Sequence, residues 1–199
     1  DQRNFSNTFI SYYTYGAVTG LALDLTLRDK FTGITLDDVM KAMWDQHGKM
    51  EKTFTNEDIE RVLGEVTGDI KFAKSFFDRH IHQNHLVDYE DLLAQAGLLL
   101  QKSNPDKAWM GETTLSFNQN KAQIINGTLI GTPVYKTGLD RGDVIVTIDG
   151  QAIVSNSDLD QIIANHVPGD TTSVSFTSRG VDKTADLILA EHPGLEVVP

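Results

Sequence analysis

Proline is confined to the second half of this sequence, and that feature constrains the fold of the first half most strongly. The chain has 199 residues, and its five prolines all fall at or after Pro105. A proline inside a helix removes a backbone hydrogen bond and clashes with the preceding turn, so a long proline-free stretch favours helices. We therefore expect a helical domain over residues 1–104, a linker at 103–106, and a second domain over 105–199.

Pairs of threonine and aspartate three residues apart indicate where two helices of the first half begin. Thr35 with Asp38 and Thr55 with Asp58 fit the capping-box pattern. Apolar residues recur at helical spacing after both pairs, and again after Asp69 and after Asp88. The sequence therefore predicts four amphipathic helices. The faces expected to be buried are Leu36, Val39, Met40, Met43 and Trp44; Ile59, Val62, Leu63 and Val66; Phe72, Ala73, Phe76 and Phe77; and Tyr89, Leu92, Leu93 and Ala96.

Residues 8–30 carry two conflicting signals. Leucine at 21, 23, 25 and 27 alternates as in a strand. No turn residue pattern interrupts about 20 residues, however, and this is far longer than a usual strand of roughly 5–6 residues. We therefore predict a helix that is buried on most sides.

The second half changes to strand periodicity. Residues 144–148 alternate and end at a turn formed by Asp149 and Gly150. Ser157 is placed to cap a short helix. Short strands separated by glycine turns favour a small β-barrel or sandwich-like module.

Composition excludes several classes of function. The net charge of -11 argues against nonspecific nucleic-acid binding, because no surplus of basic residues can neutralise phosphates. No run of 18 apolar residues occurs, so no membrane span is predicted. Cysteine is absent, which excludes disulfides, thiolate zinc sites and cysteine nucleophiles. The chain opens on Asp1 without a visible signal peptide, and we expect a processed protein or an excised fragment.

The segment 131–150 holds three motifs in a fixed order. They are Gly131-Thr-Pro-Val-Tyr-Lys-Thr-Gly-Leu139, Arg-Gly-Asp-Val-Ile at 141–145 and Ile-Asp-Gly at 148–150. In this order they resemble the motifs of a bacterial PDZ domain. The resemblance implies an α+β domain that binds an extended peptide or protein segment along a sheet edge. The residues it implies for that groove are Trp109, Met110 and Gly111 in the carboxylate-binding loop, and Leu159, Ile162 and Ile163 on the facing helix.

Position 112 departs from the PDZ pattern, which usually has an apolar residue there. Glu112 would oppose an incoming terminal carboxylate electrostatically. Capture of a peptide terminus, binding of an internal segment of the same protein, and a groove without a ligand therefore all stay open.

The first half carries four segments that together resemble a second family. They are Ser-Tyr-Tyr-Thr-Tyr-Gly-Ala at 11–17, residues 21–28, Phe-Phe-Asp-Arg at 76–79 and Ala-Gln-Ala-Gly-Leu at 94–98. They are similar to segments of the glycyl aminopeptidases, a gluzincin-type group in metallopeptidase family 61. It implies that an all-α helical bundle, the C-terminal part of a thermolysin-like catalytic domain, precedes the PDZ domain. The whole would be the C-terminal fragment of a zinc-dependent aminopeptidase from a bacterium, either periplasmic or cytoplasmic, with the periplasm favoured.

These enzymes hold zinc through a His-Glu-x-x-His helix, and none of the six histidines here forms that motif. We therefore expect no metal site in this chain, with zinc supplied by an upstream half of the same polypeptide. On this basis the chain alone is inactive. His80, His82 and His85 have metal-like spacing, but a solvated helix end is the favoured interpretation.

One catalytic element is implied by the same resemblance. Residues 13–17, Tyr-Thr-Tyr-Gly-Ala, resemble the Tyr-x-x-Gly-Ala segment of gluzincin aminopeptidases, whose tyrosine donates a hydrogen bond to the oxyanion. By that match the donor is Tyr13, with Tyr12 as the rival. Alternatively, Tyr12, Tyr13 and Tyr15 are packing aromatics at a helix start. The competing function is a noncatalytic PDZ module that binds peptides. A PDZ-bearing serine protease is disfavoured, because no Gly-x-Ser-x-Gly segment occurs and the first half reads as helical.

Overall fold

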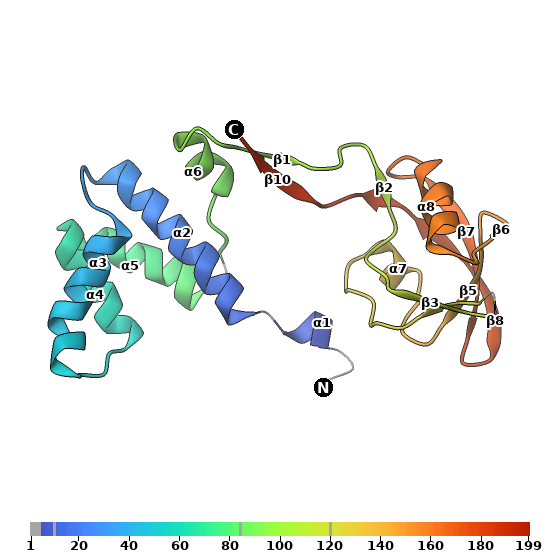
Figure 1. The fold of residues 1–199 in the computed structure, drawn as a ribbon, viewed down its shortest axis with the longest axis horizontal. Coiled ribbons are helices and arrows are strands. Elements are labelled where there is room, and N and C mark those ends of the chain that lie inside the picture. Colours follow the sequence, from blue (N-terminus) through green and yellow to red (C-terminus); the bar gives the residue numbers. More distant parts are fainter. Residues whose placement is uncertain (1–4, 10, 84, 120) are drawn as a thin grey trace. The chain divides into compact units, whose positions relative to one another are not determined.

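The computed structural model describes residues 5–9, 11–83, 85–119 and 121–199, which fall into two compact units (Figure 1). The helical unit comprises the described part of Ile10–Gln101 together with Val197–Pro199. The β unit comprises Lys102–Glu196 and the described part of Asp1–Phe9. A helical region followed by a β domain was expected, and this order of elements is confirmed.

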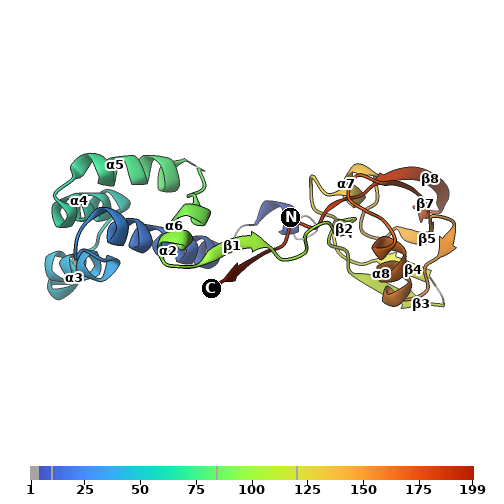
Figure 2. The same cartoon turned by 90° about the horizontal axis from the view of Figure 1, so that it is seen from above.

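The helical unit contains five α-helices among its described residues. They are α2 (Tyr12–Lys30), α3 (Leu36–Gln46), α4 (Asn56–Thr67), α5 (Ile70–Phe77) and α6 (Tyr89–Gln95), with a 3-10 turn at Gly48–Met50 and a π-helix at Asp78–His82. Figure 2 shows α4 and α5 side by side, and the two helices contact each other extensively.

Local capping explains where these helices begin. The backbone N–H of Thr35 donates to the Asp38 carboxylate at 2.9 Å, and that of Thr55 donates to the Asp58 carboxylate at 3.0 Å. Gly68 ends α4 in a left-handed conformation with φ of 69°. Residues 12–30 form one helix, so the prediction of a helix despite the alternating leucines is confirmed.

The core of the helical unit lacks some of the residues that the sequence predicts to be buried. Its buried residues are Leu23, Leu27, Val39, Met43, Val62, Leu63, Ala73, Phe76 and Phe77. Met40 and Trp44 were expected to be buried, but their side chains are 61% and 59% exposed. Each follows a buried residue by one position and is therefore rotated by about 100° around the helix. Ala96 is also exposed, beyond the end of α6.

The β unit is built on an antiparallel sheet. Its order is β3-β4-β5-β7-β8, with β6 paired to β5. The bounds are β3 (Leu115–Asn118), β4 (Lys121–Ile124), β5 (Val144–Ile148), β6 (Gln151–Ala152), β7 (Thr171–Ser178) and β8 (Val181–Ile188). Two short helices, α7 (Pro133–Lys136) and α8 (Asn156–Ala164), accompany the sheet.

Two pairs of short strands complete the sheet structure. β2 (Ala108–Trp109) pairs antiparallel with β9 (Ala190–Glu191). β1 (Leu99–Lys102) pairs with β10 (Leu195–Val198). These strands include two of the three places where the chain passes from one unit to the other, at 101–102 and 196–197.

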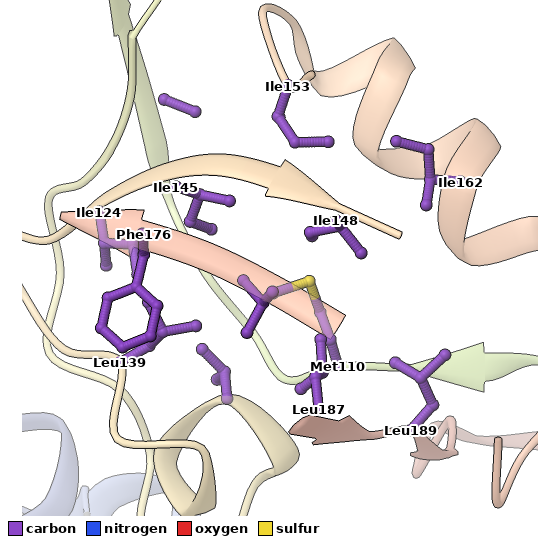
Figure 3. Packing of buried hydrophobic residues seen from close by; sticks show 13 residues of the cluster. Met110, Ile124, Leu139, Ile145, Ile148, Ile153, Ile162, Phe176, Leu187 and Leu189 are labelled. Carbon is purple, nitrogen blue, oxygen red and sulfur yellow. The ribbon is translucent and has the colours of Figure 1, made fainter. Parts of the chain in front are cut away.

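Apolar side chains from several elements fill the core of the β unit (Figure 3). Ile145 and Ile148 extend from β5, Phe176 from β7, and Ile162 from α8. Met110, the middle residue of the peptide-binding loop expected from the sequence, is buried in the same cluster. The loop is therefore anchored directly to the core.

The N-terminal helix α1 (Phe5–Thr8) is part of the β unit, although the sequence suggested a helical domain over the whole of 1–104. The Asn7 amide nitrogen donates to the carbonyl oxygen of Thr128 at 2.9 Å, and its amide oxygen accepts from the N–H of Ile130 at 2.8 Å. A side-chain amide carries both a donor and an acceptor, so it pairs with an extended backbone as a neighbouring strand does. In the described part of the chain, no helix has the length and apolarity that a membrane crossing requires.

Candidate peptide groove and tyrosine pair

A groove of about 860 Å³ lies in the β unit between the segment 106–113 and α8. Trp109, Leu159 and Ile163 contribute apolar surface to it, and Met110 and Gly111 also line it. The structure thus brings together five of the six residues expected there. Ile162 is the exception, because it is 4% exposed and points into the core of the unit (Figure 3).

Gly111 shapes the loop at one side of this groove. Its φ of 121° lies in a region that L side chains rarely adopt, and an added Cβ would lie 2.5 Å from Cγ1 of Val134. The N–H of Val134 donates to the carbonyl oxygen of Met110 at 2.7 Å, which holds the loop against α7. Within the described ranges, no acceptor pairs with the backbone N–H groups of Gly111, Glu112 and Thr113. These amides are available to a ligand oxygen.

The strand that follows the loop is a sheet edge. β3 pairs with β4 on one side, and no described strand of the six-stranded sheet pairs with its other side. An exposed strand edge with unpaired backbone groups can accept an added peptide strand. The β unit therefore offers an edge for main-chain pairing directly after the loop that lines the groove.

The sequence suggested that Ser157 caps α8, but the cap is Ser155. The Ser155 hydroxyl accepts from the N–H of Asp158 at 3.2 Å. Hydrogen bonding to Ser155, with a further bond from the N–H of Val154, lowers the pKa of the Asp158 carboxyl. Ser155 and Asp158 have the same spacing as the two capping boxes of the first half, a signal that sequence reasoning missed.

Tyr12 and Tyr13 occupy the first turn of α2 in the helical unit. Their side chains are 68% and 75% exposed, and their ring centroids lie 4.3 Å apart. A hydrogen bond with Tyr13 raises the pKa of the Tyr12 phenol. Tyr15 behaves differently, since its hydroxyl donates to the carbonyl oxygen of His80 at 2.8 Å. The first two tyrosines therefore present hydroxyls to solvent, and the third ties α2 to the π-helix.

The histidines at the end of this region do not share one environment. His80 is 9% exposed, its Nδ1 lies 2.7 Å from the carbonyl oxygen of His85, and its ring lies 4.9 Å from that of Phe76. It is therefore a packed side chain rather than the solvated one expected. His82 is exposed and lies 4.0 Å from Glu60. Nowhere in the described ranges do three His, Cys, Asp or Glu side chains gather in a way that could hold a metal ion.

Comparison with known proteins identifies the β unit. Residues 114–189 match the family model of the PDZ domain, so a PDZ domain is present. A protein of Hahella chejuensis described as "Probable periplasmic serine endoprotease DegP-like" is 31% identical over 99 residues, which are 49% of this chain and 20% of that protein. A protein of Bartonella henselae with the same description is 27% identical over 105 residues, which are 48% of this chain and 21% of that protein. The chain spans about a fifth of these relatives.

One solved structure covers both units. An aminopeptidase N family protein from Idiomarina loihiensis superposes with a TM-score of 0.80 and 24% identity, over 98% of this chain and 35% of that one. At this identity the likeness concerns the fold. The chain thus combines a helical region with a PDZ domain, and a solved aminopeptidase N family protein shares this arrangement.

Proposed function

We propose that this chain is the C-terminal part of a zinc-dependent aminopeptidase of the glycyl aminopeptidase type, which removes N-terminal residues from peptides. The observation that carries the proposal is the fold likeness to an aminopeptidase N family protein over nearly the whole chain. The segment at 11–17, which resembles the glycyl aminopeptidases, lies at the start of α2 in the part that the PDZ comparisons leave uncovered.

In this proposal Tyr13 stabilises the oxyanion of the tetrahedral intermediate, with Tyr12 as the rival. A phenol donates a hydrogen bond without carrying a charge, and such a donor acts where negative charge develops. The exposure of both side chains supports this role, because a hydroxyl at the surface of the unit can reach a substrate. Tyr15 does not qualify, since its hydroxyl is bonded to His80.

The side chains of this chain do not fit a zinc site in the part that is described. The proposal therefore assigns zinc and its ligands to an upstream half of the same polypeptide, where the metal would activate water and polarise the scissile carbonyl. The residues of this chain would donate to the oxyanion and bind peptide in the PDZ groove. A periplasmic location is part of the proposal, by analogy with the DegP-like relatives.

The test compares two proteins, the 199-residue chain and the longer polypeptide that this proposal requires. Bound zinc is measured by mass spectrometry, and hydrolysis is measured with glycyl and alanyl p-nitroanilides. We expect about one zinc and hydrolysis for the longer protein, and neither for the 199-residue chain. Stoichiometric zinc on the short chain that is lost in His82→Ala or His85→Ala would contradict the assignment, as would a longer protein without zinc or activity.

The second candidate function is a noncatalytic peptide-binding module. The groove between the Gly111 loop and α8 favours it, because that site is complete within the β unit. A longer polypeptide that binds peptides but neither zinc nor p-nitroanilide substrates would support this alternative.

A further inference from the structure

The rim of the peptide groove is acidic. Asp106, Glu112 and Asp160 line it, against the single lysine Lys107. Among the described residues, no donor bonds to the side chain of any of these three carboxylates, and none of them forms an ion pair within 4.0 Å. Glu112 and Asp160 are exposed. Their charges therefore face solvent and any ligand in the groove.

The basic groups of the groove are already engaged. The Lys107 ammonium donates to the side-chain oxygen of Asn104 at 3.0 Å. His166 lies 3.4 Å from Asp170 and 3.9 Å from Asp149. The negative charges of these two carboxylates offset any positive charge on His166. The groove thus presents net negative charge to an incoming peptide.

His192 is the other histidine of the groove. The N–H of Gly194 donates to its Nδ1 at 3.0 Å. The histidine ring also packs against Trp109, with ring centroids 6.0 Å apart, and extends the apolar surface of the groove.

The base of the groove selects for an apolar side chain. Leu159 and Ile163 lie four residues apart on one face of α8 and are half-buried, with Trp109 opposite them across the groove. An extended segment paired along β3 would direct alternate side chains towards this face. Its neighbouring residues would then lie near the acidic rim.

Glu112 also affects what the loop amides can bind. A terminal carboxylate on the free N–H groups of Gly111–Thr113 would bring a second negative charge next to the Glu112 side chain. Like charges a few ångströms apart at a surface weaken binding by roughly three- to tenfold. A main-chain carbonyl of an internal segment carries no net charge and avoids this repulsion.

From these contacts and charges we propose that the groove binds an extended internal peptide segment in which an apolar residue is flanked by lysine or arginine. The inference rests on the proposed peptide-binding role and specifies its ligand class. A partner with a free C-terminal carboxylate or acidic flanks is the disfavoured ligand.

The test uses the whole chain and six fluorescein-labelled decapeptides, followed by fluorescence anisotropy. Each peptide has a central leucine flanked by lysine, serine or glutamate, and its C-terminus is either free or amidated. We expect the amidated lysine peptide to bind about tenfold more tightly than the glutamate peptide, with a smaller difference at 300 mM than at 50 mM NaCl. Glu112→Gln and Asp160→Asn should each reduce the preference for lysine about threefold. Asp186→Asn removes an exposed carboxylate of β8 outside the groove and should leave it unchanged.

The outcomes separate the inference from the role on which it rests. Binding of the serine peptides, with amide shifts at Gly111–Thr113 and along α8, supports the peptide-binding role itself. If the glutamate or free-carboxylate peptides bind as tightly as the amidated lysine peptide, the role stands and the inference is wrong. If no peptide binds at 1 mM protein, both are wrong.

Discussion

Gly111 and Val134 approach each other so closely that no side chain fits at position 111. An added Cβ would lie 2.5 Å from Cγ1 of Val134 and 3.1 Å from Cβ of Thr132. Val134 is fully buried in the core of the β unit, so neighbouring side chains prevent it from moving away from position 111. The backbone path of the loop at 109–111 therefore requires glycine at position 111.

Gly111→Ala should lower the free energy of unfolding by about 1–3 kcal/mol, because it adds both a clash and backbone strain. Peptide affinity should fall more than tenfold as the loop amides move. Gly131→Ala is the matched control, since its φ of 91° is also positive but open space surrounds its added Cβ. Urea denaturation and anisotropy measure the two effects. Equal losses in both variants would show that the contact with Val134 does not matter.

Tyr15→Phe should destabilise the chain by about 0.5–1.5 kcal/mol, the usual net value of one hydrogen bond. The variant leaves the carbonyl oxygen of His80 without the hydroxyl that donates to it at 2.8 Å. Tyr13→Phe is the control in the same turn, because its exposed side chain should contribute little to stability. Thermal denaturation by circular dichroism compares them. A Tyr13→Phe loss as large as that of Tyr15→Phe would contradict this assignment.

Asn7→Ala should destabilise the β unit by about 1–3 kcal/mol, because two hydrogen bonds to the backbone of Thr128 and Ile130 are lost. A fragment of residues 105–199 should still fold cooperatively, since the core of the β unit lies within it, but with reduced stability. Amide dispersion in NMR spectra and urea denaturation check both statements. A fragment that is unfolded, or as stable as the β unit of the whole chain, would contradict them.

Acid should destabilise the helical unit through its capping aspartates. Hydrogen bonds from the backbone N–H of Thr35 and of Thr55 lower the pKa values of Asp38 and Asp58 respectively. A lowered pKa in the folded state gives stability that is present above the unfolded value, near 3.9, and is lost as the pH falls through the lower folded value.

Asp38→Asn and Asp58→Asn should therefore lower stability at pH 7 and have a smaller effect near pH 2. Urea denaturation followed at 222 nm between pH 2 and 7 measures this change. Asp29→Asn, which removes an exposed carboxylate of α2, is the control. Parallel pH profiles for wild type and both capping variants would contradict the expected linkage.

In the proposed full-length enzyme, Tyr13→Phe should lower kcat by about 10²–10³ and leave KM nearly unchanged. A donor to the oxyanion acts in the transition state, and removal of one such donor typically costs this much. Tyr12→Phe is the matched comparison, because its ring lies beside that of Tyr13. Bound zinc should be unchanged in both. If Tyr12→Phe alone is severe, the donor is Tyr12, and if neither variant is affected, the pair has no catalytic role.

The sequence could predict features of this fold that depend on neighbouring residues. Thr55 and Asp58 are three residues apart and form their cap whatever surrounds them, so the start of α4 was readable. The strand at 144–148 was readable for a similar reason, because its alternation and the turn after it are local. The groove could be located through the ordered PDZ motifs.

Only the tertiary structure decided which side of each element is covered. Periodicity alone did not separate Ile162, in the core, from Ile163, in the groove, or the buried Met43 from the exposed Trp44. Each pair differs by one position, about 100° of helix, and a neighbouring element decides between the two. The pairing of Asn7 with Thr128 joins residues 121 positions apart, and no local pattern encodes it. The sequence by itself determined the helices and strands through short-range hydrogen bonds and backbone preferences, whereas long-range packing decided which side chains were left for function.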